Sequence, residues 1–92
     1  MKVTLAELEQ AAKDLGIKVT FEDLRTSKGG ACRVMETRRI IINKHLHAQE
    51  KISVLARELG RFDLSRVDLA DHVKKKILRE AEQSADALKR SA

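Results

Sequence analysis

The apolar residues of this chain recur with two different periods, and each change of period marks a predicted element. Leucine and alanine return at helical spacing over residues 5–15. Thr4 and Glu7 form the capping box that begins a helix, and Gly16 is the left-handed residue that ends one. Residues 17–21 then alternate between apolar and polar, which is typical of a strand with one buried face. The first part of the chain therefore predicts a helix followed by a strand.

A β-hairpin is predicted next. Residues 25–30 are polar and end in two glycines, which indicates a loop. The two strands of the hairpin are expected over residues 31–35 and 39–43, joined by a turn at residues 36–37. Residues 40–42 are isoleucines and are apolar on both faces of the strand. The second strand is therefore expected in the middle of the sheet or beneath a helix.

Two more helices complete the predicted α+β fold. Apolar side chains fall on one arc over residues 48–62, and near one face over residues 67–89. Gly60 interrupts the first of these helices at a cost of about 1 kcal/mol, so another element is expected to approach it closely. Residues 1–92 are predicted to form a single domain with frayed last residues. Its small sheet of about three strands is accompanied by an N-terminal helix, a motif helix and a C-terminal helix.

Length and composition restrict the class of protein. The chain has 92 residues, of which 42% are hydrophobic and 36% charged, as expected for a folded soluble domain with one modest core. No apolar run is long enough to span a bilayer, and the N-terminus does not read as a signal peptide. Cys32 has no second cysteine to pair with and is expected to be a buried, inert thiol. These features predict a cytoplasmic protein that has no contact with a membrane.

A short motif in the second helix carries the main functional signal. Residues 56–61 read Ala-Arg-Glu-Leu-Gly-Arg. A zinc-binding helix of the His-Glu-x-x-His type places two histidines four residues apart, on one face, around a single metal. Arg57 and Arg61 have this spacing, and Glu58 stands where the general base would stand. Guanidinium has no lone pair to donate and stays protonated at physiological pH, so neither zinc, another cofactor nor a catalytic residue is predicted.

The motif and the strand before it resemble a known family. The strand over residues 40–43, Ile-Ile-Ile-Asn, and the helix over residues 52–61 are similar to those of the ImmA/IrrE family of zincin-like metallopeptidases. The active helix of that family typically reads Ala-His-Glu-(Leu or Ile)-Gly-His, and the resemblance covers roughly residues 5–64. It implies a small bacterial-type domain with a short helix, a small sheet and a metal helix packed beneath it. Since arginines replace both histidines, it also implies a metal-free pseudoenzyme that acts as a protein-interaction or regulatory module.

Other interpretations of the motif stay open. The helical wheel places Arg57 and Arg61 on the side away from the apolar arc, beside Glu50 and Val54. Glu50, Arg57, Glu58 and Arg61 could form an ordinary charge network on a solvent-facing helix. A residual metal-dependent hydrolase could use Glu58 with an unidentified metal. The three histidines and Cys32 could be combined into a relocated metal site, although histidines in a loop before a helix are more often exposed or capping groups. No small-molecule substrate is indicated.

The positive charge of the chain offers an alternative function. The net charge is +5, and residues 25–46 hold six basic residues against one acidic residue. Such a hairpin could hold phosphates electrostatically, without reading a base sequence. The two aromatic residues are too few for a stacking platform, and strands separate the first two helices, which excludes a helix-turn-helix. The candidate phosphate contacts of a basic nucleic-acid-associated protein are Arg25, Lys28, Arg33, Arg38, Arg39, Lys44, Lys74, Lys75 and Lys76.

The C-terminal helix predicts a partner. Residues 69–78 are expected to fold back and close the core beneath the motif helix. Ala81, Ala85 and Leu88 extend a thin apolar stripe beyond the reach of a core of this size. Because an exposed apolar stripe usually marks a contact surface, we expect a homodimer or a protein partner to cover it.

Overall fold

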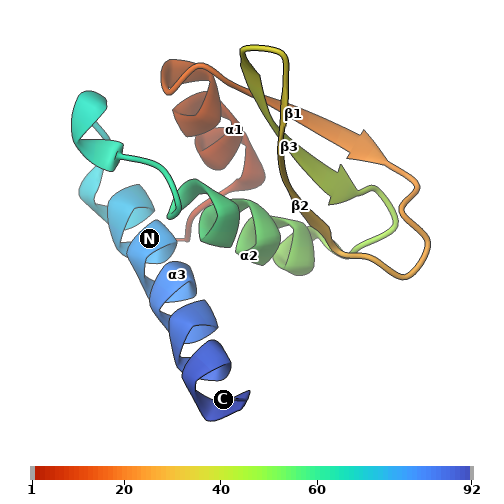
Figure 1. Ribbon diagram of the computed structural model, residues 1–92. Helices are drawn as coiled ribbons and strands as arrows, with labels where there is room; N and C mark the ends of the chain where they lie inside the picture. The colour runs from red at the N-terminus through yellow and green to blue at the C-terminus, as the bar shows by residue number, and fades with distance from the viewer. Residues whose placement is uncertain (1, 92) are drawn as a thin grey trace.

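The structure, a computed structural model, places α1 and α2 against a small mixed sheet and α3 against the far side of α2 (Figure 1). It describes the backbone of residues 2–91 and the side chains of residues 2–82. The predicted α+β fold, with an N-terminal helix, three strands and a C-terminal helix, is confirmed. The elements are α1 (Leu5–Asp14), β1 (Ile17–Glu22), β2 (Gly29–Val34), β3 (Thr37–Asn43), α2 (Ala48–Leu59), the short 3-10 helix η1 (Leu64–Arg66) and α3 (Asp71–Ser91).

The sheet is ordered β1-β3-β2, so that β3 has a neighbour on both sides. It runs parallel to β1 and antiparallel to β2. The predicted central position of the isoleucine strand is therefore confirmed. The hairpin is also confirmed, but its strands begin at Gly29 and at Thr37, two residues earlier than the predicted starts at 31 and 39. Gly29 has a φ of +143° and lies so close to Ile41 that a Cβ would collide with the Ile41 carbonyl oxygen, which only glycine avoids.

The core lies between the sheet and the helices. The face of the sheet that carries Ile17, Ile40 and Ile42 is turned toward α1 and α2. Because α2 is packed between the sheet and α3, it contributes buried side chains to both contacts. The fully buried large side chains are Leu8, Ile40, Ile42, Leu55, Leu59 and Ile77. No helix among the described residues is both long and apolar enough to cross a membrane.

The start of α1 is tied to α3 by a single carboxylate. The predicted capping box is present: the Glu7 amide donates to Thr4 Oγ1 at 3.2 Å, and the Thr4 amide donates to Glu7 Oε1 at 3.0 Å. Glu7 Oε2 also lies 2.5 Å from His72 Nε2 of α3. The Thr4 amide, and after it His72, lower the pKa of Glu7 below its ordinary value, because each stabilises the charged carboxylate.

The segment between α2 and α3 differs from the prediction. The motif helix was expected to reach Phe62 but ends at Leu59, with Gly60 as its C-cap. The last helix was expected from residue 67 but begins at Asp71. Val67 is extended, with φ −130° and ψ 154°, and Leu69 packs on the core from this non-helical segment. The periodicity of the sequence could not separate Leu69 from the helix, because its side chain meets the same core as the apolar residues of α3.

α2 and α3 cross at Gly60. A Cβ on Gly60 would lie 2.6 Å from the Cβ of Ala81 and 3.4 Å from the carbonyl oxygen of Ile77. The φ of Gly60 is −65°, which any residue adopts, so the requirement for glycine is steric. The close approach predicted from the sequence is therefore confirmed, and α3 is the element that makes it.

We expect Gly60→Ala to lower the free energy of unfolding by about 1–3 kcal/mol, because the added methyl overpacks the crossing. Urea denaturation measures this loss. Gly30→Ala is the matched control, since nothing lies within 4 Å of a Cβ there. In the double variant Gly60→Ala with Ala81→Gly, part of the loss should return as a coupling between the two sites. If Gly60→Ala unfolds like the wild type, the helices are not in close contact.

Candidate functional site

The motif residues Arg57, Glu58 and Arg61 form one charge cluster at the end of α2. Glu58 is 3% exposed, whereas the Arg61 side chain is 64% exposed. The two oxygens of the carboxylate face different arginines. Arg57 Nε lies 3.7 Å from Oε1, and Arg61 Nε lies 3.2 Å from Oε2. The positions at which the family pattern has histidines thus hold two guanidinium groups around a buried carboxylate.

The burial of Glu58 decides between two interpretations of the motif. In an ordinary exposed charge network the Glu58 carboxylate would lie in water. Glu58 is buried, so this interpretation of the motif is wrong for Glu58. Val54 was also placed on the solvent side by the helical wheel, beside Arg57, but it is 3% exposed. That placement was wrong because the wheel assumed one buried face, whereas α2 packs on the sheet and on α3.

The contact between Glu58 and Arg61 is electrostatic and lacks a directed hydrogen bond. Oε2 of Glu58 is buried and accepts no hydrogen bond from the described groups, although Arg61 Nε is 3.2 Å away. The N–H of Arg61 is not aimed at the oxygen. Burial of the carboxylate reduces the screening of this attraction, whereas water around the exposed Arg61 side chain weakens it.

These residues do not fit the zinc ion that the family pattern implies. Zinc in proteins takes three or four thiolate, imidazole or carboxylate ligands. Two of the motif positions offer guanidinium, which has no free lone pair, and both oxygens of Glu58 face a cation. Within the part of the chain that the structure describes, no three His, Cys, Asp or Glu side chains come together as a metal site.

The three histidines lie apart, and two of them, His45 and His72, make local side-chain contacts. His45 faces Asp23 in the loop after β3, and His47 is the N-cap of α2 without a side-chain cap bond. His72 lies in α3 and holds Glu7. The expectation that the histidines before the motif helix are exposed or next to a helix start is confirmed.

Cys32 was expected to be buried, and this was wrong. It lies in β2, an edge strand, and is exposed. Its neighbour Ala31 pairs with the buried Ile40, so Cys32 points to the opposite face of the sheet. The apolar residues around Cys32 in the sequence did not reveal this, because the pairing partner decides which face is covered.

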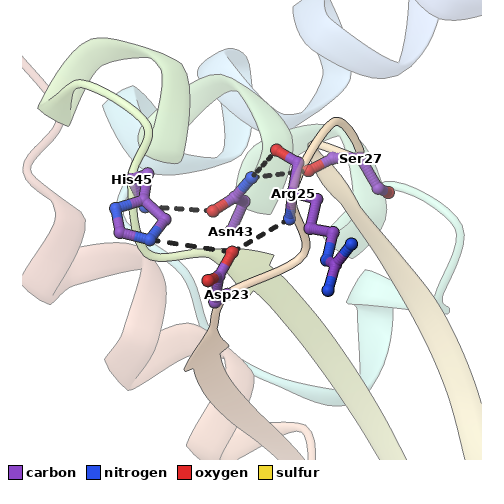
Figure 2. A network of polar contacts seen from close by, with 5 residues as sticks. All are labelled: Asp23, Arg25, Ser27, Asn43 and His45. Carbon is purple, nitrogen blue, oxygen red and sulfur yellow. Dashed lines mark hydrogen bonds and ion pairs between the residues drawn. The ribbon is translucent and has the colours of Figure 1, made fainter.

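Asn43 organises the loops at the end of β3 (Figure 2). Its Nδ2 donates to the carbonyl oxygens of Arg25, at 3.0 Å, and Ser27, at 2.9 Å. Its Oδ1 accepts from the amide of His45 at 3.0 Å. Asp23 Oδ1 accepts from the Arg25 amide at 3.0 Å, and this bond, followed by the charges of the neighbouring basic groups, lowers the pKa of Asp23. The only sequence signal for this role was a polar residue at the end of an apolar strand.

The predicted phosphate contacts fall into separate places. Arg25, Lys28 and Lys44 belong to the loops whose backbone is held at Asn43. Arg33 and Arg38 pair with each other across the hairpin, at the opposite end of β3. The Arg38 guanidinium lies over the ring of Phe62, 5.6 Å from its centroid.

The remaining predicted contacts lie on two further surfaces. Arg39 pairs with Cys32 and so lies on the face of the sheet turned away from the helices. Its side chain is half-buried, and its Nε has no partner among the described groups. Lys74, Lys75 and Lys76 belong to α3. The structure therefore does not bring the nine basic residues into one phosphate-binding surface.

The expected folding back of the C-terminal helix is observed for Val73 and Ile77, which are buried in the core. Ala81 is half-buried and lies at the crossing with Gly60. The side chains of Ala85 and Leu88 lie outside the described residues, so self-association through them stays a prediction.

A mixed three-stranded sheet packed on a helix with this motif spacing defines a zincin-like α+β domain. Residues 12–89 match the family model of the IrrE N-terminal-like domain, a peptidase family. The match covers most of the chain, so the chain belongs to this family, and the predicted ImmA/IrrE-like domain is confirmed. The match also extends the relationship beyond the motif helix and through most of α3. Neither the curated proteins nor the solved structures contain a match to this chain.

We expect Asn43→Ala to lower the free energy of unfolding by about 2 kcal/mol, because two carbonyls and one amide lose their partner in a partly buried place. Amide hydrogen exchange over residues 23–28 should become faster at the same time. Gln10→Ala serves as the control, since its bond to Asp14 is exposed and the loss should stay within about 0.5 kcal/mol. Equal losses for both variants would contradict the proposed role of Asn43.

A double-mutant cycle with Glu58→Gln and Arg61→Gln should yield a coupling energy of about 1 kcal/mol, since one partner is buried and the other exposed. Urea unfolding of the four proteins provides the measurement. The matched cycle pairs Glu58→Gln with Arg66→Gln, a basic residue of η1 that forms no ion pair with Glu58. Its coupling should be within about 0.3 kcal/mol of zero. Equal couplings would show that the cluster does not hold Glu58.

Proposed function

We propose that this chain is a non-catalytic member of its family that acts as a protein-interaction or regulatory module. One observation carries the proposal: Arg57 and Arg61 stand at the two metal-ligand positions, with the Glu58 carboxylate between them. Two cations repel a zinc ion at this place. A general base must also reach the proton that it removes, and Glu58 is almost completely buried.

The rest of the domain supports a role in binding. The core is closed, so the loss of metal ligands does not imply the loss of the fold. β2 is an edge strand, and an edge presents unpaired backbone groups to which an extended segment of another protein can add. The turn beside this edge also exposes Val34 and Met35, two large apolar side chains. A protein partner would cover them.

Metal analysis tests the proposal directly. Protein purified without a metal-affinity tag should contain far less than one equivalent of zinc and should not cleave unfolded casein. The double variant Arg57→His with Arg61→His should not gain tight zinc binding, because a third ligand and its supporting contacts are also required. One equivalent of zinc in the wild type, lost on Glu58→Ala, would overturn the proposal and favour a residual hydrolase.

The second candidate is a nucleic-acid-associated protein, which the position of Arg25, Lys28 and Lys44 in the loops beside Asn43 favours. Binding of this kind would weaken steeply with salt, since each neutralised phosphate releases counterions. Duplex DNA titrated at low and at physiological salt separates the two functions. Salt-dependent binding that is lost on Lys28→Glu with Lys44→Glu would establish the second candidate.

A further inference from the structure

A groove of the described molecule lies beside α3, away from the motif. It has a volume of about 680 Å³. The chain segment before α1, the first turns of α2 and the first half of α3 form its walls, and the N-terminal segment lies beside α3 (Figure 1). Its lining includes Lys2, Val3, Ile52, Lys75, Lys76 and Arg79, together with Gln49, Asp71 and His72.

The rim of this groove is basic. Lys76 is already engaged, with its Nζ 2.8 Å from Glu80 Oε1. Lys2, Lys75 and Arg79 are exposed and form no ion pair with any side chain of residues 2–82. Asp71 is the one acidic residue of the lining. The groove therefore offers three cations that an anionic ligand can reach.

The floor of the groove is apolar. Val3 is half-buried, and Ile52 is 6% exposed at the bottom. The alkyl stems of lysine and arginine add apolar surface beneath their charged ends. An apolar centre inside a charged rim is the usual composition of a protein-binding surface. A matching ligand carries carboxylates at its edges and an apolar side chain between them.

A phosphate backbone matches the groove less well. Asp71 would repel it from within the lining, and neither Phe21 nor Phe62 lines the groove as a stacking surface for bases. The basic loop residues Arg25 and Lys44 are not part of the lining either, so the positive charge does not continue along one track. The groove accommodates a short segment with mixed chemistry better than a uniformly charged polymer.

We propose that this groove binds an acidic segment of a partner protein. Carboxylates of the segment contact Lys2, Lys75 and Arg79, and an apolar side chain between them packs on Val3 and Ile52. The inference rests on the proposed role as an interaction module and supplies the chemistry of its partner. It places the binding surface on α3 and not on the degenerate motif.

The test uses the full chain and a short fluorescein-labelled peptide in which aspartate and glutamate flank one leucine. Fluorescence anisotropy measures its affinity. Lys75→Glu with Arg79→Glu should weaken binding by roughly tenfold, the equivalent of about 1.4 kcal/mol. Lys13→Glu with Lys18→Glu changes the net charge equally but lies on α1 and β1, outside the lining of the groove, and should change the affinity by less than roughly twofold. Circular dichroism verifies that all variants are folded.

A charge-reversed peptide, with lysine in place of each acid, should bind the groove variant better than the wild type. The proposal is overturned if the acidic peptide does not bind, or if both variants weaken it equally. Duplex DNA that binds through Lys75 and Arg79 and displaces the peptide would also overturn it, in favour of a phosphate ligand. Zinc content is measured separately. A protein that contains zinc would contradict the proposed non-catalytic function, but it would not change the peptide affinity measured for the groove.

Discussion

The packing of α2 between the sheet and α3 is the constraint on which the rest of the structure depends. Leu55 and Leu59 are fully buried by it, and the crossing with α3 leaves no room for a side chain at Gly60. Because two sides of the helix are covered, positions that a helical wheel assigns to solvent become interior. Val54 and Glu58 are both interior for this reason.

A buried carboxylate needs a compensating charge, and the motif arginines supply it. An isolated charge in a low-dielectric interior is costly, whereas one with cations nearby is tolerated. In a zinc-binding helix the metal supplies positive charge at this place. Here Arg57 and Arg61 hold the same two positions and keep their own charges within 4 Å of Glu58. The substitution of histidine by arginine is therefore compatible with the fold, although it is not compatible with the metal.

The surface of the domain is divided by the same architecture. The hairpin places Arg33 and Arg38 at one end of β3, and Asn43 holds the backbone of Arg25 and Lys28 at the other. α3 carries its own basic groove next to the N-terminal segment. A positive net charge thus becomes several small surfaces with different neighbours, and a binding partner meets one of them at a time.

The sequence by itself determined the local elements and the family. The capping box at Thr4, the alternation from Ile17 and the spacing of Arg57 and Arg61 are local patterns, so each could be read without knowing any distant contact. Only the tertiary structure decided the burial of Glu58 and the exposure of Cys32.

It also decided which basic residues share a surface. These properties depend on which segments meet, such as α2 with α3 or β2 with β3. Contacts between residues distant in the sequence leave no periodic signal along the chain. The glycine at position 60 is an informative exception: its place in the predicted helix indicated a close neighbour, and Ala81 is that neighbour, although the helix already ends at Leu59 and Gly60 is its C-cap.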